Sequence, residues 1–358
     1  MLKTDLKRTQ HFTTRSAQIC ENLLEFIPSD ASLIEPFAGG EDLIELFPDA
    51  SWEKYDIEPT NNTIVKRDTL KTPPDYKGKW VITNPPYLAK NKAKDKELFQ
   101  QYNNLDDLYK ISIKTILDSE GGILIIPTNF FTDERSSDIR TEFLNVFDVL
   151  KVNIFTMPVF DTTTYSVCSF VFKRKQETKA EVQSFPVLIH PSKDSLTLTL
   201  DPDTGYRVAG EFYQKIDAEQ SMFSRLLLSN PNVNYITNIK LYAIDTRNER
   251  IRLEYEPNLF YGKATDRTYA TFVSDVPLTE EQQKQIVDSF NLTLNNFRNE
   301  YKDISMTNYR DYNRKRIGFD FAYKLATHVA KSIIELRGGN PLFLFFNLKH
   351  GLLIKNMI

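Results

Sequence analysis

The stretch Trp80-Val81-Ile82-Thr83-Asn84-Pro85-Pro86-Tyr87 decides the fold that we expect of this chain. Its first four residues are apolar or β-branched, a composition that predicts a buried strand. The strand must stop at Asn84, because the two prolines that follow lack a backbone N–H and restrict their own φ angles. The sequence therefore predicts a strand that ends abruptly in a stiff polar loop.

Strand and helix patterns alternate on both sides of this loop. Helical spacing of apolar residues is found at Ser16 to Ile27, Asp42 to Phe47 and Leu105 to Leu117. Strand patterns are found at Ala31 to Phe37, Trp52 to Ile57, Ile123 to Ile126, Val149 to Phe155 and Ser166 to Lys173. This alternation predicts an α/β fold with a doubly wound, mostly parallel sheet.

The pattern changes near Thr178, beyond which short strands are followed by two long helices. The helices are expected at Thr279 to about Tyr301 and at Phe319 to Leu336. Thr279 and Gln282 form a capping-box pattern at the start of the first helix. We therefore expect two domains: residues 1–177 with the α/β sheet and residues 178–358 with mixed α+β structure.

The composition argues against several classes of protein. The polar N-terminal residues lack the apolar run of a secretory signal, and no stretch approaches the roughly 20 apolar residues that cross a bilayer. Because the chain has only Cys20 and Cys168, a disulfide framework is not indicated and a cytoplasmic location is expected. The cysteines and four histidines show no metal-ligand spacing, so we expect no metal. A net charge of −3 argues mildly against a surface that is basic throughout.

The tetrapeptide after the strand has the groups needed to activate an aromatic amine. The amino nitrogen of adenine is a poor nucleophile, because its lone pair is delocalised into the ring. The side-chain oxygen of Asn84 and the carbonyl of Pro85 can accept both of its hydrogens, which favours a pyramidal nitrogen. Pro85 and Pro86 hold these acceptors in a fixed relation, and Tyr87 offers a flat face to an extruded base. Such a site suits any planar amine or amide.

A second set of residues indicates a nucleotide-like cofactor. The turn Glu35-Pro36-Phe37-Ala38-Gly39-Gly40 follows a strand, and its glycines let the backbone approach a ligand closely. Asp56 lies where a carboxylate can bind a ribose diol, and Asp68 is placed to accept from an adenine amino group of the cofactor. Taken singly, each feature also fits an ordinary turn or a surface carboxylate. Ligands of open α/β sheets bind at the carboxyl ends of the strands, so we expect all of them in one crevice with the tetrapeptide.

With these residues in place, the first half of the chain resembles the γ-class amino-methyltransferases, the adenine-N6 DNA methyltransferases of restriction-modification systems. The resemblance implies S-adenosylmethionine as cofactor, a class I, Rossmann-like methyltransferase fold, and a target-recognition domain after the catalytic one. Gln10 to Thr14 is similar to the family's N-terminal cofactor motif, although Thr14 stands where proline is common. The cofactor-binding residues that the resemblance implies are Thr13, Glu35, Pro36, Phe37, Ala38, Gly39, Asp56, Ile57, Asp68 and Asn84.

The resemblance also implies a second aromatic residue in the target pocket and an interface with nucleic acid. The loop Val159 to Tyr165 resembles the segment that supplies this residue, with Phe160 as the first choice and Tyr165 as the second. The expected partner is double-stranded DNA, from which the target adenine must be extruded. The basic residues expected to contact DNA are Lys90, Lys92, Arg267, Arg310, Arg314, Lys315 and Arg316. A monomer is slightly favoured.

Other functions stay open at this stage. The same tetrapeptide can serve an adenine in RNA or a glutamine amide in a protein. The glycine-poor first motif and the long C-terminal half argue against the glutamine substrate and favour DNA, whereas RNA is harder to exclude. A catalytically silent nucleic-acid-binding module is a second alternative, against which the intact Asn84 argues. A fused restriction and modification enzyme is a third, but the C-terminal half has no nuclease-type cluster.

Overall fold

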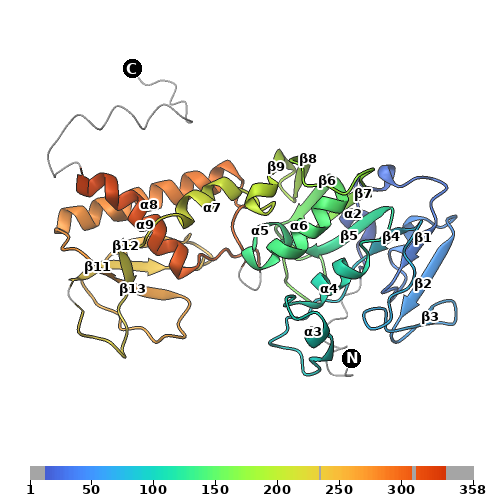
Figure 1. Cartoon of the computed structure of the whole chain (residues 1–358), viewed down its shortest axis with the longest axis horizontal. Helices are drawn as coiled ribbons and strands as arrows, with labels where there is room; N and C mark the ends of the chain where they lie inside the picture. The colour runs from blue at the N-terminus through green and yellow to red at the C-terminus, as the bar shows by residue number, and fades with distance from the viewer. Residues whose placement is uncertain (1–12, 234, 309–311, 336–358) are drawn as a thin grey trace, which may run out of the picture. The chain divides into compact units, whose positions relative to one another are not determined.

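The computed structural model describes residues 13–233, 235–308 and 312–335 (Figure 1). Its chain divides into two compact units. The first comprises the described part of Met1–Tyr213 together with Glu300–Arg316, and the second comprises the described part of Gln214–Asn299 and Ile317–Ile358. Among the described residues, no helix combines the length and apolar character that crossing a membrane requires.

A nine-stranded sheet forms the centre of the first unit, with the order β3-β2-β1-β4-β5-β7-β6-β8-β9. The strands are β1 Leu33–Glu35, β2 Trp52–Asp56, β3 Val65–Lys66, β4 Trp80–Thr83, β5 Gly121–Pro127, β6 Phe147–Phe155, β7 Val167–Arg174, β8 Gln183–His190 and β9 Asp194–Leu200. Neighbours from β3 to β5 are parallel, as are β6 and β8, whereas β7 is antiparallel to both β5 and β6. The predicted mostly parallel α/β sheet is therefore confirmed.

The two middle strands, β4 and β5, are buried along nearly their whole length. Their continuous apolar runs are typical of parallel strands that are covered on both faces. The backbones approach very closely where β5 begins, since a Cβ on Gly122 would lie only 1.8 Å from the carbonyl oxygen of Val81. Glycine is thus required at this position for the two strands to pair.

Short helices and turns connect the strands of this unit. The α-helices are α2 Ser16–Ile19, α3 Glu97–Gln101, α4 Leu108–Thr115, α5 Asn129–Thr132, α6 Ser137–Val146 and α7 Gly210–Asp217, which continues into the second unit. The 3-10 turns are η1 Leu24–Phe26, η2 Ile44–Leu46, η3 Glu134–Ser136 and η4 Pro202–Thr204. The helix expected at Ser16 to Ile27 is interrupted, because Asn22 has a φ of 58°, which a right-handed helix cannot include. The one expected at Asp42 to Phe47 is reduced to η2, since so short a segment gains few helical hydrogen bonds.

The first unit extends past the domain boundary that we expected near Thr178. Strand β8 pairs in parallel with β6, and β9 then pairs antiparallel with β8. Residues up to Leu200 therefore belong to the same sheet as the tetrapeptide, and the boundary at residue 178 falls inside this unit. The segment Glu300–Arg316 also returns to it from the C-terminal half of the chain.

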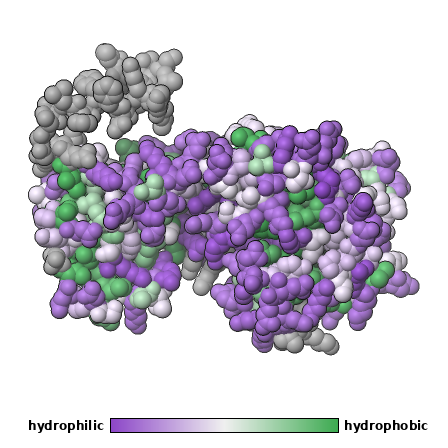
Figure 2. Space-filling model, viewed as in Figure 1, coloured by the Kyte–Doolittle hydropathy of each residue, from purple (hydrophilic) through white to green (hydrophobic). Residues whose placement is uncertain are grey.

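The second unit contains a four-stranded sheet with the order β10-β13-β11-β12, together with the two expected helices. Its strands and helices are β10 Phe223–Arg225, β11 Tyr235–Tyr242, β12 Arg252–Tyr255, β13 Tyr269–Ser274, α8 Glu280–Glu300 and α9 Phe319–Glu335. The capping box is present: the Thr279 N–H donates to Gln282 Oε1, and the Gln282 N–H donates to Thr279 Oγ1. Figure 2 shows that polar residues cover most of the visible face, with apolar residues in small separate groups.

Candidate active site

The expected polar residues lie at the carboxyl ends of three adjacent parallel strands. Glu35 is the last residue of β1, Asp56 is the last residue of β2, and Asn84 follows β4 directly. Strand β1 pairs with both of the others, so the three strand ends open onto one edge of the sheet (Figure 1). This edge is where open α/β sheets bind their ligands.

The turn after β1 is fastened to the end of β2. Gly39 donates its backbone N–H to Asp56 Oδ2 over 3.0 Å, and Glu58 donates its N–H to Asp56 Oδ1 over 2.8 Å. Gly39 has a φ of 48°, in the left-handed region that glycine adopts without strain. Thr60 secures the same residue by donating its hydroxyl to the Gly39 carbonyl over 2.9 Å. Asp56 is therefore held in place by backbone N–H groups and keeps lone pairs for a ligand.

Glu35 is a buried carboxyl group that joins β1 to β4. Its Oε1 accepts from the Phe37 N–H over 3.0 Å and from the Thr83 hydroxyl over 2.5 Å. Only 2% of the residue is exposed, and this burial raises the pKa of Glu35 to about 8. The two hydrogen bonds oppose the rise, whereas the negative charge of Asp56 adds to it. Glu35 thus holds the first cofactor motif against the strand that leads into the tetrapeptide.

The segment around Asp68 lies beside the same turn. The buried hydroxyl of Thr69 donates to the Pro36 carbonyl over 2.9 Å, which brings Asp68 near the end of β1. Asp68 Oδ1 also accepts from the Lys71 N–H over 3.3 Å. The three cofactor motifs that were separate in the sequence are therefore adjacent in the fold. Their carboxylates are acceptors, and S-adenosylmethionine offers matching donors in its ribose hydroxyls, its ammonium group and its adenine amine, so this set of acceptors fits the cofactor.

Hydrogen bonds on both sides orient the side chain of Asn84. Its Nδ2 donates to Thr13 Oγ1 over 3.1 Å. On the other side, the Tyr87 hydroxyl lies 2.5 Å from Asn84 Oδ1 and 2.6 Å from the Ile125 carbonyl oxygen, within donating distance of both. A carbonyl-type oxygen has two lone pairs, so Asn84 Oδ1 can accept from Tyr87 and from one further donor. The amide is thus oriented before any substrate arrives.

Tyr87 and Phe160 lie together, as expected, but Tyr87 does not present an open flat face. Both residues are 4% exposed, and their ring centroids are 6.4 Å apart with a tilt of 55°. Tyr87 also packs edge-on against Tyr109, at a centroid distance of 6.3 Å. The expectation of a freely exposed stacking surface is therefore wrong for this conformation, because the Tyr87 hydroxyl is anchored to β5 and draws the ring inward.

Asp107 is a residue of this site that the sequence analysis missed. Its Oδ1 accepts from the backbone N–H of Leu88, the residue after the tetrapeptide, over 3.0 Å. It also caps α4 by accepting from the Tyr109 N–H over 3.5 Å. Burial raises the pKa of Asp107 to about 7, although both hydrogen bonds oppose the rise. An aspartate ahead of an amphipathic helix is a recognisable N-cap signal and could have identified it.

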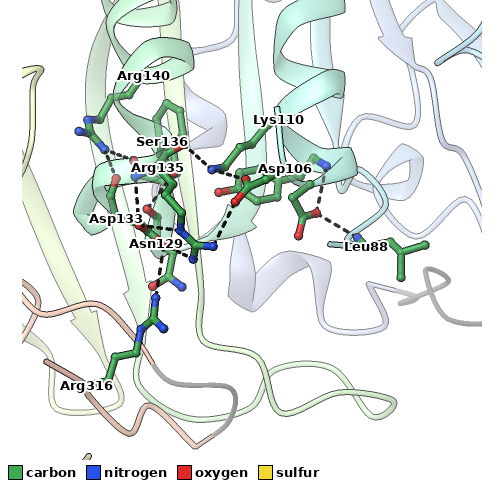
Figure 3. Close-up of polar contacts among 12 residues, drawn as sticks. Leu88, Asp106, Lys110, Asn129, Asp133, Arg135, Ser136, Arg140 and Arg316 are labelled. Carbon is green, nitrogen blue, oxygen red and sulfur yellow. Dashed lines mark hydrogen bonds and ion pairs between the residues drawn. The ribbon is translucent and has the colours of Figure 1, made fainter. Parts of the chain in front are cut away.

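An ion-pair network surrounds the start of α4 and continues toward α5 (Figure 3). The Lys110 ammonium lies 2.7 Å from Asp106 Oδ1, and Arg135 lies 3.3 Å from Asp106 Oδ2 and 2.8 Å from Asp133 Oδ2. Arg316, expected to bind phosphate, has its guanidinium 3.9 Å from Asp133 Oδ2 with 39% of its side chain exposed. Part of its charge is therefore balanced within the protein.

The other residues expected to bind DNA have different surroundings. Lys315 is 4% exposed, and its ammonium donates to Asn308 Oδ1 over 2.6 Å and to Asn313 Oδ1 over 2.7 Å, so its expected role in binding phosphate is wrong for this conformation. Lys92 and Arg267 are exposed, whereas Lys90 and Arg314 are half-buried. Arg310 lies outside the described residues.

The 159–165 loop is a meeting point for several segments of the first unit. Asp161 accepts from the Thr14 hydroxyl and from the Arg15 guanidinium, each over 3.4 Å. The Tyr165 hydroxyl lies 3.4 Å from the Lys92 ammonium. The Thr164 carbonyl accepts from the backbone N–H of Tyr312 over 3.2 Å. The loop that contains Phe160 is thus contacted by residues from both ends of the chain.

Fold and site together define a class of protein. A sheet of order β3-β2-β1-β4-β5-β7-β6 with β7 reversed, and with acidic residues at the ends of β1 and β2, is a class I S-adenosylmethionine-dependent methyltransferase fold. Within this class, residues 55–197 match the family model described as N-6 DNA Methylase. The resemblance to adenine-N6 DNA methyltransferases is thereby confirmed for this part of the chain.

Comparisons with whole proteins are more distant. No curated protein matches the chain. Among solved structures, the M protein of the type I restriction enzyme EcoKI is 14% identical, over 50% of this chain and 48% of that one, with a TM-score of 0.37. A type I restriction-modification methyltransferase subunit from Streptococcus thermophilus is 13% identical, over 51% and 47%, with a TM-score of 0.38. A DrdV–DNA complex is 13% identical, over 67% and 35%, with a TM-score of 0.42. The chain thus spans slightly less than half the length of each of these two type I subunits.

Proposed function

We propose that this protein transfers a methyl group from S-adenosylmethionine to the exocyclic amino group of an adenine extruded from duplex DNA. The observation that carries the proposal is the orientation of Asn84, whose amide is held between Thr13 and Tyr87 directly beyond β4. Glu35, Asp56 and the segment around Asp68 lie along the same edge of the sheet. A cofactor bound at these residues and an amine bound at Asn84 would therefore be adjacent, as methyl transfer between two bound molecules requires.

The cofactor would be held by the acceptors of the β1 and β2 ends. Asp56 would bind the ribose hydroxyls, and Asp68 would accept from the cofactor's adenine, with Thr13, Ile57 and the turn Glu35 to Gly39 around it. When bound, S-adenosylmethionine supplies an electrophilic methyl group on a sulfonium cation. The carboxylates of this edge favour a cation nearby.

Asn84 and Pro85 would position the target amine. Asn84 Oδ1 would accept one amino hydrogen, and the Pro85 carbonyl would accept the other. Both bonds favour a pyramidal nitrogen whose lone pair points at the methyl donor. The extra proton leaves to solvent after transfer, so no general base is needed. Phe160 and Tyr87 form the aromatic wall of the pocket, against which the base lies once the pocket opens.

The second unit is proposed as the target-recognition domain. The C-terminal half contains exposed polar, basic and aromatic side chains, a mixture suited to phosphate and base-edge contacts. The candidates for DNA contact that stay exposed or half-buried across both units are Lys90, Lys92, Arg267, Arg314 and Arg316.

Methyl transfer to different polymers tests the proposal. The purified protein is incubated with S-adenosylmethionine that has a labelled methyl group and with random-sequence duplex DNA, structured RNA or denatured protein. We expect label in duplex DNA, at the N6 atom of adenine, within one sequence context. Label only in RNA or only in protein would contradict the DNA assignment.

A variant pair then tests the site. Asn84→Ala is expected to lose at least about 1000-fold in methyl transfer while duplex binding survives, because it removes an acceptor aimed at the reacting amine. Asn104→Ala, at an exposed position of the same unit, is the matched control and keeps wild-type activity. Equal activity of Asn84→Ala and wild type would refute the assigned role.

A further inference from the structure

Tyr312 is an aromatic residue displayed on the surface by a strained turn. Its side chain is 64% exposed, the largest exposed fraction among the described large apolar and aromatic residues. Its backbone has a φ of 51°, and Asn313 follows with a φ of 54°. Left-handed conformations at non-glycine residues persist only where surrounding contacts impose them, and they are common at functional sites. The contacts that hold this turn are therefore informative.

Buried and reciprocal hydrogen bonds clamp the turn to the first unit. The buried Lys315 ammonium donates to Asn313 Oδ1 and to Asn308 Oδ1, and so links these two residues. Asn308 in turn donates its N–H to Asn129 Oδ1 over 2.9 Å and accepts from Asn129 Nδ2 over 3.4 Å. Asn129 is the first residue of α5, just beyond the end of β5. A buried cation thus holds the residues on either side of an exposed aromatic residue.

The turn is attached to the loop that contains Phe160. The Tyr312 N–H donates to the Thr164 carbonyl over 3.2 Å. Thr164 belongs to the 159–165 loop, whose Phe160 packs against Tyr87 and whose Tyr165 lies near the exposed Lys92. The backbone of Tyr312 is therefore anchored to the loop that contains Phe160, next to Tyr165, whose hydroxyl contacts Lys92.

We infer that Tyr312 contacts the nucleic-acid substrate, stacking on a base of the opened duplex beside the adenine that enters the pocket. The inference rests on the proposed function. Aromatic rings stack on bases of any sequence, and side chains inserted at a base step stabilise unstacked DNA. Lys92 beside the loop supplies the positive charge that a neighbouring phosphate requires. Tyr312 is thus a substrate-positioning residue contributed by the segment that returns from the C-terminal half.

The test compares two duplexes of a sequence that the wild type methylates. In the first, the target adenine is paired with thymine, and in the second it faces an abasic site and is already unpaired. Single-turnover methylation is measured for wild type, Tyr312→Ala and Tyr312→Phe. Leu292→Ala, on α8 with 63% exposure, is the matched control for loss of an exposed large side chain. Thermal unfolding confirms that each variant folds.

We expect Tyr312→Ala to slow methylation of the paired duplex by about 10-fold, in line with the loss of one base stack. On the abasic duplex the loss shrinks to less than about 2-fold, because the base no longer needs to be held open. Tyr312→Phe keeps the ring and the wild-type rate, and so does Leu292→Ala. A wild-type rate for Tyr312→Ala on the paired duplex, or an equal loss on both duplexes, would overturn the inference while leaving the proposed function intact. No methylation of any duplex by the wild type would overturn both.

Discussion

Replacing Glu35 with Gln removes a titrating group from the buried junction of β1 and β4 while keeping its shape. The amide oxygen of Gln can still accept from the Phe37 N–H and the Thr83 hydroxyl, which both bond to Oε1 in the wild type. What changes is the response to pH. The pKa of Glu35 rises from its ordinary 4.5 to about 8 in the folded protein, so between these values the folded state holds a proton that the unfolded chain releases.

The sign and the size of the effect follow from this difference in bound protons. The free energy of unfolding of the wild type falls by about 1.4 kcal/mol for each pH unit in this window, because deprotonation favours the unfolded chain. From pH 4.5 to pH 8 the total loss at this group reaches roughly 5 kcal/mol. Glu35→Gln has no such loss. Other groups titrate equally in both proteins, so the difference between variant and wild type isolates Glu35.

Tryptophan fluorescence provides the assay. The chain has two tryptophans, Trp52 and Trp80, and both lie in the first unit, in β2 and β4. Urea unfolding followed by their emission at pH 5, 6, 7 and 8 therefore reports on the unit that contains Glu35. We expect the stability of Glu35→Gln relative to wild type to increase at each step, whereas the exposed control Glu45→Gln shows no trend. Parallel pH profiles for Glu35→Gln and wild type would refute the reasoning.

Three further predictions concern single hydrogen-bonding groups. Tyr87→Phe keeps the packed ring but removes the hydroxyl that orients Asn84, so single-turnover methylation should fall by about 10-fold and stability by about 1–2 kcal/mol; an unchanged rate would contradict it. Asp107→Ala removes the cap of α4 and the acceptor for the N–H after the tetrapeptide, and should cost about 1–3 kcal/mol in urea unfolding, most of which Asp107→Asn recovers. Arg298→Ala leaves Asp245, only 13% exposed, without its bidentate partner and should destabilise the second unit by about 3–5 kcal/mol. Circular dichroism should then show melting at a lower temperature, whereas tryptophan emission, which reports on the first unit, should change less.

Sequence patterns correctly predicted the helices and strands whose conformation depends on residues close to them in the chain. The strand at Trp80 to Thr83 agrees with β4 in both bounds, because a buried run ended by two prolines has few alternatives. The helix from Thr279 was found from its capping box, which is a contact between residues three apart. The helix α6, Ser137–Val146, was missed, although Ile139, Phe143 and Leu144 have helical spacing and are buried.

Contacts between distant segments were beyond the sequence patterns. Nothing in residues 183–200 distinguishes strands that extend the first sheet from strands that begin a new domain, because strand pairing depends on which edge is available. The run Arg314-Lys315-Arg316 looks uniformly basic, yet Lys315 turns inward to two asparagines while Arg316 stays partly exposed. In an irregular segment, which side chains are buried and which are exposed depends on the residues that pack against it.

The sequence by itself determined that this protein has a mostly parallel sheet with a stiff Asn-Pro-Pro-Tyr loop after one strand, since prolines and glycines act through their own backbone geometry. It also predicted which side chains would accept hydrogen bonds from a cofactor and from a target base. Only the tertiary structure decided how these groups are held: Asn84 between Thr13 and Tyr87, and the tetrapeptide loop by Asp107. The physical reason is that burial and hydrogen-bond geometry arise when residues far apart in the chain are brought together, which no local pattern records.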